Sequence, residues 1–390
     1  MPLRATRSMP VRVLITNAEH HAMLATCRSL DAAGYEVAAV AFTPLAPTHA
    51  SRSCSERLRM IDPAVDAERF ISELREQLTR RRYAMLVAGS DRALLAISAA
   101  REQLEQLTRI GLPDQQVIER SLNRAVLADA AAAVGLSPAR SIRCDEPGAV
   151  LRAARELGFP VIVKSATAVA RAGSAIRQAF STRRFEREEV LAAAISTHPG
   201  ALLVQQFEHG QLLSFSGVMT DGGLLALATA RYRRTWPVEA GNAAFAETIV
   251  PPAQLLHAIP ELLALIGWEG IFELELIWTV DGRFVPIDLN PRPYGSLALA
   301  NAAGAPLAAI WCDSLMEKDP RGARAQSGRR YRWEDGDLRH CAWQLGQGNY
   351  RAALDTARPR RGVIHAYFQR ADPLPLLMRA ANRACAGVDR

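Results

Sequence analysis

The six cysteines of this chain are scattered, and no C-x-x-C pair occurs among them. Their spacing argues against a structural zinc site and a disulfide framework, and it suits a reducing cytoplasm. No apolar run approaches the length of about 18 residues that a transmembrane helix needs. The basic residues 1–7 are followed by a short apolar strand instead of the h-region of a signal peptide. We therefore expect a cytoplasmic protein with no membrane partner.

Aromatic residues are also few, at 6%, and no basic stripe is interleaved with them. The net charge of +7 comes mostly from arginine, which is densest at residues 80–82, 329–332 and 358–361. Such a charge is compatible with nucleic-acid binding, but without that stripe or a zinc-finger spacing we favour an anion-binding cleft and expect no nucleic-acid partner. At 390 residues the chain is too long for one typical core, so two or three domains are expected.

The N-terminal part of the chain alternates between short apolar runs and amphipathic stretches. This rhythm predicts a parallel sheet covered by helices, with strands at residues 11–15, 36–41 and 84–88 and helices at residues 22–34, 66–82 and 93–107. The turn after the first strand, residues 16–21, contains no glycine, so a dinucleotide-binding fingerprint is absent. We assign this region a scaffold or substrate-side role. His20 and His21 end this turn; contact with substrate is one interpretation, and solvated loop histidines are the commoner case.

The most informative stretch is residues 270–296, where two alternating runs flank Asp281-Gly282. Asp-Gly in this position predicts a hairpin with a two-residue type I′ turn. In that register Glu275 faces Asp288 and Glu273 faces Asn290, while the opposite face of the hairpin is apolar. Carboxylates opposed at about 4.5–5.5 Å repel one another. A bound divalent cation such as Mg²⁺ would offset them, since it accepts carboxylate and amide oxygens; a face that simply points into water is the alternative.

The second strand of this hairpin carries two further signals. Pro286 cannot donate to a ladder, which predicts that its position faces an unpaired edge or a bulge. The strand continues into Asn290-Pro-Arg-Pro-Tyr-Gly-Ser, which supplies a fixed turn, the guanidinium of Arg292 and backbone amides beside the acids. These groups are suited to binding phosphate.

With these residues the chain resembles the ATP-grasp superfamily, in its carbamoyl-phosphate-synthase-like and carboxylate–amine ligase branch. The resemblance implies an α/β (α+β) ATP-grasp fold with a Rossmann-like N-terminal domain, a lid subdomain and a mainly antiparallel catalytic core. It implies that Glu275, Asp288 and Asn290 hold two Mg²⁺ ions, which Mn²⁺ can replace, against the phosphates of ATP. Asp288 stands where the family has Glu and is one methylene shorter. Arg292 would lie near the γ-phosphate or the acyl substrate.

The resemblance extends to the phosphate contacts upstream. Arg124 stands early in a predicted helix where the family has Lys, and it keeps the charge in a forked form. Lys164 ends an apolar strand, where an anionic partner is the simplest explanation and a snorkelling lysine the alternative. The family places this lysine against the α-phosphate. It also expects a glycine-rich flap over the phosphates, for which this chain offers only Gly173 and Ser174 within residues 165–174.

Residues 201–210 resemble the family's adenine-binding hinge. Phe207 would place its backbone at the base, and Gln206 replaces the usual Glu. Glu208 and Gln211 are both candidates for the ribose, and a plain edge strand is the alternative.

Residues 231–242 contain three arginines in four positions, followed by Trp236-Pro237. We interpret them as an anion-binding loop in which Arg231 or Arg234, with Arg292, steadies the acyl intermediate; a solvated charge run is the alternative. In an extended segment Arg231 and Arg233 point away from Tyr232 or Arg234. Glu247, on the next predicted strand, is a candidate partner for one of these arginines.

The resemblance implies an ATP-dependent ligase that joins a small-molecule carboxylate to an amine through an acyl phosphate. The alternatives are a bicarbonate-using relative of carbamoyl-phosphate synthase and biotin carboxylase, and an ATP-binding regulatory protein without turnover. No protein nucleophile is needed, because positioning and charge stabilisation carry phosphoryl transfer. A homodimer is expected from the resemblance alone. The expected divisions are residues 1–120, 121–205, 206–318 and 319–390, and no chemistry is evident in the last.

Overall fold

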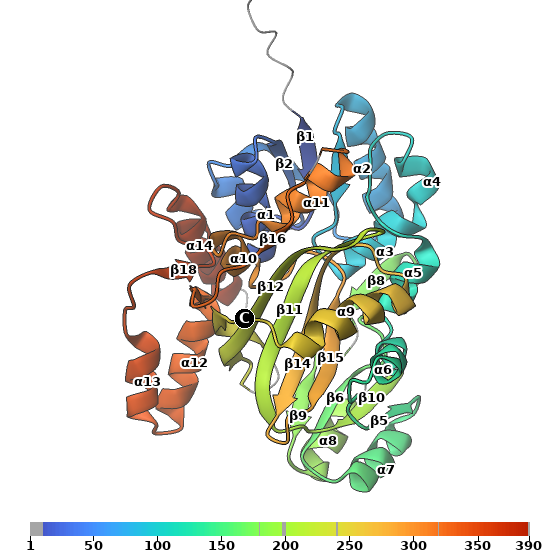
Figure 1. Ribbon diagram of the computed structural model, residues 1–390, viewed down its shortest axis with the longest axis vertical. Helices are drawn as coiled ribbons and strands as arrows, with labels where there is room; N and C mark the ends of the chain where they lie inside the picture. The colour runs from blue at the N-terminus through green and yellow to red at the C-terminus, as the bar shows by residue number, and fades with distance from the viewer. Residues whose placement is uncertain (1–10, 179, 197–199, 239–240, 319, 389–390) are drawn as a thin grey trace, which may run out of the picture.

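The computed structural model describes residues 11–178, 180–196, 200–238, 241–318 and 320–388 (Figure 1). Its strands form a parallel sheet, a small antiparallel sheet, a large mostly antiparallel sheet and a two-stranded hairpin. In the described part of the chain no helix is both long and apolar enough to cross a membrane. The mixed α/β composition agrees with the predicted fold class. The predicted domain limits at residues 120, 205 and 318 stay a prediction.

The N-terminal unit is the predicted parallel sheet, in the order β3-β2-β1-β4. Asp66 caps its helix α2 as predicted, accepting a hydrogen bond from the backbone N–H of Arg69 at 3.0 Å. The glycine-free turn after β1 is made by Asn17, whose φ of 61° lies in the left-handed region that asparagine tolerates. Strand β3 was not predicted. The elements are β1 (Arg12–Ile15), α1 (His21–Ala32), β2 (Glu36–Ala41), the 3₁₀ helix η1 (Pro47–Ala50), β3 (Cys54–Arg59), α2 (Ala67–Arg80), β4 (Met85–Val87), α3 (Asp91–Ala99) and α4 (Arg101–Leu104).

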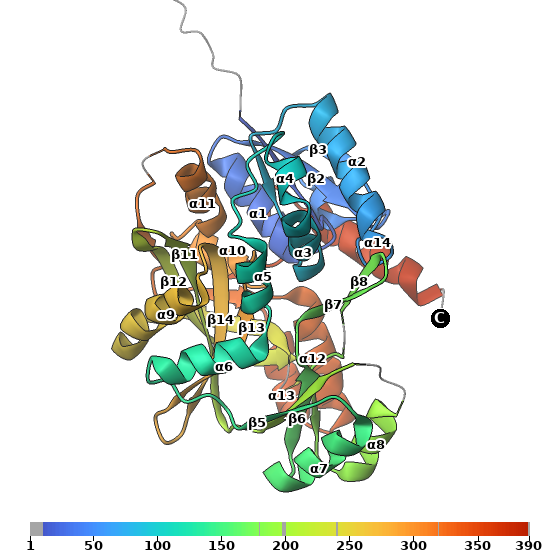
Figure 2. The ribbon, with the colours of Figure 1, turned by 90° about the vertical axis from the view of Figure 1, so that its right-hand side faces the viewer.

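The next part of the chain forms a four-stranded antiparallel sheet, β5-β10-β6-β9, with two helices on it. The β7–β8 hairpin leaves this sheet and reaches the N-terminal unit, as Figure 2 shows. The elements are α5 (Gln115–Ser121), α6 (Arg124–Ala133), β5 (Ser141–Cys144), α7 (Pro147–Leu157), β6 (Val161–Ser165), β7 (Val169–Ala172), β8 (Ala175–Gln178), β9 (Arg183–Phe185), α8 (Glu188–Ile195) and β10 (Leu202–Gln206).

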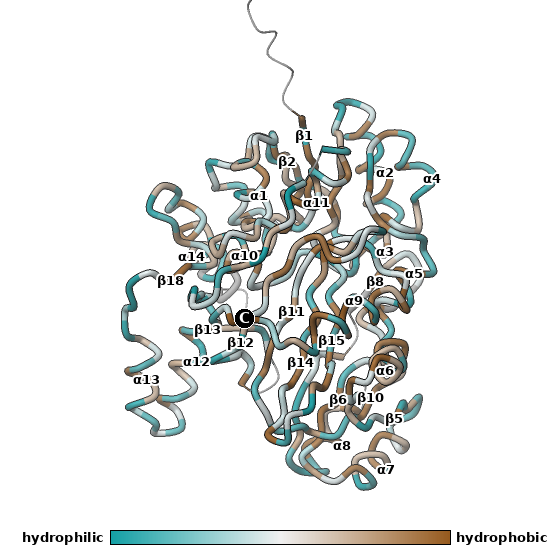
Figure 3. The backbone as a smooth tube through the Cα atoms, viewed as in Figure 1, coloured by the Kyte–Doolittle hydropathy of each residue, from teal (hydrophilic) through white to brown (hydrophobic). Residues whose placement is uncertain are grey.

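The large sheet runs β15-β14-β11-β12-β13-β17-β18, with β16 paired to β12. Helix α9 lies beside the large sheet, and both have strongly hydrophobic stretches (Figure 3). Leu255 and Ile259 of α9 belong to the same buried cluster as Phe272 and Leu274 of β14. The elements are β11 (Gly210–Thr220), β12 (Gly223–Trp236), β13 (Asn242–Thr248), α9 (Ala253–Ile266), β14 (Gly270–Thr279), β15 (Phe284–Asn290), α10 (Leu297–Ala302), α11 (Leu307–Leu315), β16 (Ala323–Arg324), β17 (Arg330–Arg332), α12 (Glu334–Gly346), α13 (Tyr350–Ala357), β18 (Val363–His365) and α14 (Leu374–Val388).

The β14–β15 hairpin has the predicted register only in its first half. Glu275 faces Asp288 and Glu273 faces Asn290, but the pairing then shifts by one residue, so that Leu276 faces Pro286. The predicted two-residue turn is wrong. The N–H of Thr279 bonds the carbonyl of Arg283 at 3.0 Å, which leaves a three-residue loop with Gly282 at φ 86°. The prediction for Pro286 is confirmed, because β15 is the edge strand and the irregularity lies beside this residue.

Candidate active site

A cavity of about 1100 Å³ lies where the N-terminal unit, the small antiparallel sheet and the large sheet meet. Eleven of the fourteen residues predicted for the site line it, although they come from segments far apart in sequence. They are Arg124, Lys164, Gln206, Phe207, Glu208, Gln211, Arg234, Glu275, Asp288, Asn290 and Arg292. Gly173, Ser174 and Arg231 are not among the lining residues.

One wall of the cavity carries the acidic face of the β14–β15 hairpin. The hydroxyl of Tyr232, on β12, lies 3.0 Å from a carboxylate oxygen of Glu273 and 3.0 Å from one of Glu275. The amide nitrogen of Asn290 donates to the other oxygen of Glu273 at 3.1 Å. Tyr232 was not predicted as a site residue. The signal was available, since it alternates with Arg231 on a strand and must face the other way.

Negative charge is concentrated on this wall. Burial, followed by the nearby charges of Glu273 and Asp288, raises the pKa of Glu275. Burial also raises the pKa of Glu273, although hydrogen bonds from Tyr232 and Asn290 lower it in part. Carboxyls that raise one another's pKa gain from a cation that neutralises them, so the donor set fits a hard divalent ion.

The fit rests on donor chemistry and not on a compact cage. Within the described ranges, no three His, Cys, Asp or Glu side chains gather closely enough to hold a metal ion. The predicted set contains only two carboxylates and one amide. Their oxygens are bonded to neighbouring side chains, so a bound ion would replace some of those contacts.

Two cations stand opposite the acids. Arg124, at the start of α6, lies 3.2 Å from one oxygen of Asp288, and it donates to the carbonyl of Ser165 at 3.0 Å. The ammonium group of Lys164 donates to the carbonyl of Ile287 at 2.7 Å. Burial, with the charge of Arg124 next, lowers the pKa of Lys164 to about 8. Lys164 is therefore held inside the cavity by a backbone contact rather than snorkelling out to water.

Arg292 joins the hairpin to the N-terminal unit. It makes two hydrogen bonds to the carboxylate of Asp91, at 2.7 and 3.0 Å, and a third to the amide oxygen of Asn290 at 3.0 Å. Asp91 is the first residue of α3, which Ser90 caps. The paired geometry fixes the guanidinium plane in the cavity wall. No local pattern indicates this partner, which lies 201 residues away.

The predicted hinge follows β10 and forms another part of the wall. The guanidinium of Arg184 stacks on the ring of Phe207 at 4.2 Å, and Glu208 pairs with Arg283 at 3.3 Å. The side chain of Gln211 donates to the carbonyl of Tyr232 at 2.6 Å. Both ribose candidates therefore already have protein partners.

The flap assignment is not supported by the geometry. Gly173 and Ser174 form the tip of the β7–β8 hairpin, and the carbonyl of Ser174 accepts a hydrogen bond from the N–H of Ala67 at 2.7 Å. Ile176 is buried in the core cluster that includes Phe70 of α2. The tip is therefore docked on the N-terminal unit, away from the cavity wall.

The arginines of residues 231–242 have different surroundings, which the sequence did not predict. Arg231 pairs with Glu247 at 3.1 Å and is not among the lining residues of the cavity, and its assignment as a catalytic group stays a prediction. Arg234 lines the cavity but donates both of its bonds to Asp337 of α12, each at 2.8 Å. The proposed pairing of Glu247 with this segment is confirmed, since Arg233 also contacts it at 3.0 Å.

The C-terminal residues, in which no chemistry was evident, close one end of the cavity. The ring of His21 stacks on Trp333 at 5.2 Å and meets Tyr367 edge-on at 5.7 Å. Burial lowers the pKa of His21 to about 3, so the ring is neutral. His21 is thus packed between aromatic rings, and its interpretation as a solvated loop residue is wrong.

Comparison with known proteins agrees with this architecture. No protein-family model matches the chain. It is 30% identical over 208 residues to the carbamoyl phosphate synthase large chain of Hyperthermus butylicus, a match that covers 50% of this chain and 19% of that protein. It is 28% identical over 306 residues to the large chain of Mycobacterium tuberculosis (strain CDC 1551 / Oshkosh), which covers 73% of this chain. That match spans 26% of the relative, so the chain corresponds to about a quarter of its length or less.

Solved structures share the fold at low identity. N5-carboxyaminoimidazole synthetase from Staphylococcus aureus superposes with a TM-score of 0.62 at 12% identity, covering 83% of this chain and 82% of that one. An L-amino acid ligase from Bacillus licheniformis gives 0.60 at 11%, covering 80% and 75%. The biotin carboxylase domain of Hydrogenobacter thermophilus 2-oxoglutarate carboxylase gives 0.62 at 15%, covering 83% and 74%. These structures share their fold with the chain, in agreement with the predicted ATP-grasp fold.

Proposed function

We propose that the chain is an ATP-dependent ligase that joins a carboxylate to an amine through an acyl phosphate. The observation that carries this proposal is the convergence of Lys164, Arg124 and Arg292 with the acidic face of Glu275 and Asp288 on one cavity. A metal–nucleotide complex requires both kinds of group, because cations bind its phosphates and acids bind its metal ions. The L-amino acid ligase and the synthetase that share the fold support a C–N bond-forming reaction.

The chain's own residues would bind and orient ATP. Lys164 and Arg124 would contact phosphate oxygens, and the backbone at Phe207 would meet the adenine. Glu275, Asp288 and Asn290 would hold two Mg²⁺ ions, or Mn²⁺ in their place. When bound, these ions neutralise the charge of the β- and γ-phosphates. The biotin carboxylase domain, whose structure contains MgADP, supports this cofactor.

The reaction requires positioning and no protein nucleophile. An oxygen of the substrate carboxylate forms a bond to the γ-phosphorus while the bond to ADP breaks, which gives an acyl phosphate. The amine nitrogen then bonds to the acyl carbon, inorganic phosphate leaves, and the amine proton passes to solvent. Arg292, which Asp91 holds, would contact the charged acyl phosphate. We assign the opposite end of the cavity, beside His21 and Trp333, to the small-molecule substrates.

A bicarbonate-using reaction is the second candidate, because the sequence relatives are carbamoyl phosphate synthases. In that case bicarbonate would take the place of the organic carboxylate as the acceptor of the γ-phosphoryl group. ADP would then form with bicarbonate present and no other acid. A regulatory protein that binds ATP without turnover is the third candidate, and it would form no ADP with any acceptor.

A substrate screen tests the proposal. Purified protein with Mg²⁺ and ATP is incubated with a panel of carboxylic acids and amines, and ADP and phosphate are measured. Hydroxylamine replaces the amine in parallel reactions, because it converts an acyl phosphate to a hydroxamate. We expect acid-dependent ADP and hydroxamate in the wild type and neither in Lys164→Met. ADP formation that needs no organic acid, or none at all when ATP binds, would contradict the ligase assignment.

A further inference from the structure

A second hollow, of about 520 Å³, lies where strands β12, β13 and β17 meet helices α12 and α13. Its volume falls in the range of about 300–1,000 Å³ that small-molecule sites occupy. Its walls include Arg233, Arg330 and Arg360, with the ring of Phe245. Arg233, Arg234 and His340 line both this hollow and the larger cavity, so the two are neighbours.

Arginines outnumber carboxylates on one side of this hollow. Glu247 is 3.1 Å from Arg231, 3.0 Å from Arg233 and 3.8 Å from Arg330. Partial burial raises the pKa of Glu247, but the hydrogen bonds from Arg233 and Arg231 outweigh it and lower the net pKa. One carboxylate charge is thus shared by three guanidinium groups.

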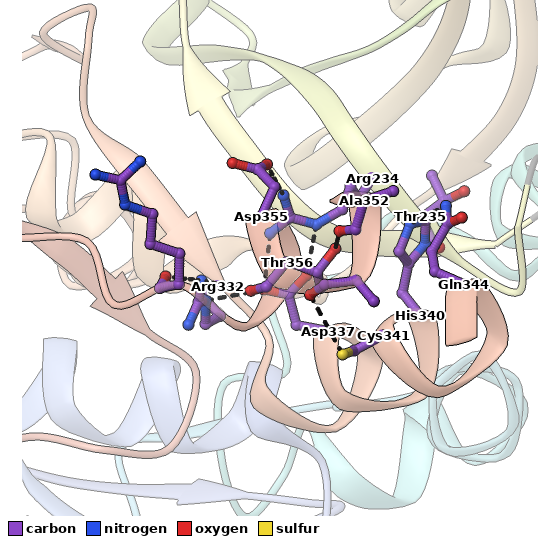
Figure 4. Close-up of polar contacts among 12 residues, drawn as sticks. Arg234, Thr235, Arg332, Asp337, His340, Cys341, Gln344, Ala352, Asp355 and Thr356 are labelled. Carbon is purple, nitrogen blue, oxygen red and sulfur yellow. Dashed lines mark hydrogen bonds and ion pairs between the residues drawn. The ribbon is translucent and has the colours of Figure 1, made fainter. Parts of the chain in front are cut away.

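The opposite side repeats the pattern, as Figure 4 shows. Asp337 is 2.8 Å from both Arg234 and Arg332. Asp355 pairs with Arg360 and lies 3.9 Å from Arg234. Across both sides, and counting the part of the chain that the structure describes, six arginines meet three carboxylates. Of these residues, four arginines and two carboxylates line the hollow itself, so its lining carries a surplus of two positive charges.

An aromatic ring, in addition to the shared carboxylates, holds three of these guanidinium groups in place. Arg234, Arg332 and Arg360 lie 4.5, 5.9 and 5.7 Å from the centre of the Phe245 ring, within cation–π distance. The Nε atom of Arg360, which lines the hollow, is buried, with no hydrogen-bond partner among the described residues. Fixed guanidinium forks with unused donors match the oxygens of a phosphate group.

We propose that this hollow binds a multiply charged, phosphate-bearing small molecule, at a site separate from the one assigned to the phosphates of ATP. The surplus charge provides the attraction, and the fixed forks provide the selectivity for tetrahedral oxyanions. Bound there, the anion bridges β12 and the α12–α13 pair. Since β12 also carries Tyr232, occupancy links the C-terminal helices to the acidic wall of the larger cavity. The inference does not depend on the ligase activity.

Binding of inorganic pyrophosphate, measured by calorimetry at constant ionic strength, tests the proposal with two matched double variants. Arg330→Gln with Arg360→Gln removes two charges from the hollow. Arg329→Gln with Arg361→Gln removes the same charge from the neighbouring exposed positions, which do not line it. We expect the first pair to weaken pyrophosphate binding by at least about tenfold, and the second pair to bind within about twofold of wild type.

Two results would overturn the proposal. Equal binding by all three proteins would place the pyrophosphate elsewhere, for example at Lys164. Equally weakened pyrophosphate binding in both double variants would show that the overall charge of the protein, and not this hollow, determines the affinity. Ala352→Glu supplies a second test that keeps every arginine: it puts a carboxylate into the hollow from α13, at a half-buried helical position. It should abolish binding with an unchanged unfolding midpoint, and wild-type affinity would contradict the site even if the first variant failed to fold.

Discussion

A terminal nitrogen of Arg124 lies 3.2 Å from one carboxylate oxygen of Asp288 and 3.3 Å from the other. The contact links the start of α6 to a predicted metal ligand 164 residues away. The guanidinium of Arg124 therefore reaches Asp288 directly, and the pair joins a predicted phosphate contact to a predicted metal ligand.

Arg124→Met should weaken ATP binding by roughly tenfold or more, because one charge-assisted contact contributes about 1.5–3 kcal/mol. Arg124→Lys should keep most of the affinity, since it preserves the charge and loses only the forked geometry. Titration calorimetry with a non-hydrolysable ATP analogue checks both variants. Equal affinity in wild type and Arg124→Met would show that this arginine does not contact the nucleotide.

The Arg292–Asp91 pair should stabilise the contact between the N-terminal unit and the large sheet. Its side chains are only about one-fifth exposed, at 20% and 19%. A double-mutant cycle with Arg292→Gln and Asp91→Asn should give a coupling energy of about 1.5–3 kcal/mol in the free energy of unfolding.

The matched control for that cycle is the surface pair Arg155–Glu188, whose side chains are 60% and 33% exposed. Its coupling should stay below about 1 kcal/mol, because exposed pairs are screened by water. Similar coupling energies in the two cycles would contradict a special role for the Arg292–Asp91 contact.

Tyr232→Phe should change how Mg²⁺ affinity depends on pH. Raised carboxyl pKa values mean that the acids hold protons above the ordinary Glu range, and metal binding must release them. Affinity should therefore rise with pH. The Tyr232 hydrogen bonds lower the pKa of both acids, so their loss should move the rise to higher pH.

Calorimetric Mg²⁺ titrations from about pH 6 to about pH 9 measure this profile. Tyr294→Phe is the control, because the Tyr294 hydroxyl is bonded to the Ser216 hydroxyl, at 2.6 Å. The raised pKa values of Glu273 and Glu275 also affect the free energy of unfolding without metal. They stabilise the fold at low pH, and this contribution is lost as the pH rises and the two acids ionise. A profile that is flat, or that Tyr294→Phe shifts equally, would refute the assignment.

The docked β7–β8 hairpin should behave as part of the core. Ile176→Ala should lower the free energy of unfolding by about 2–5 kcal/mol, because Ile176 is 1% exposed. Val190→Ala, on the exposed side of α8, should change it by less than about 0.5 kcal/mol. Chemical denaturation measures both. A small effect of Ile176→Ala would mean that the hairpin is free of the N-terminal unit in solution.

Local pattern was enough to predict the parts of the fold that depend on nearby residues. The parallel βαβ rhythm, the Asp66 cap and the facing of Glu275 and Asp288 all follow from periodicity and turn chemistry. The loop length of the β14–β15 hairpin did not, since Asp281-Gly282 suits both a two-residue turn and a three-residue loop with glycine left-handed. Strand β3 was missed because its exposed residues, Ser55 and Arg57, break the apolar run.

Partners chosen by tertiary contact could not be read from the sequence. Alternation along β12 predicted that Arg231 points away from Tyr232, and Glu247 was expected to pair with one of the arginines, but nothing indicated that Asp337 would bind Arg234. A shift in pairing beside Arg234 also breaks the alternation there. Nor does any local pattern indicate that Trp333 would pack on His21. These contacts join segments separated by long stretches of chain.

Thermal unfolding with and without Mg²⁺ and ATP tests the central claim most directly, in wild type, Glu275→Ala and Asp288→Ala. At about 100 times Kd, a bound nucleotide should add roughly 2.7 kcal/mol to the stability of the wild type. We expect this gain in wild type and its loss in both variants, which would establish that the acidic wall and the nucleotide share one site. An unchanged unfolding midpoint in folded wild type, or an equal gain in all three proteins, would contradict the account.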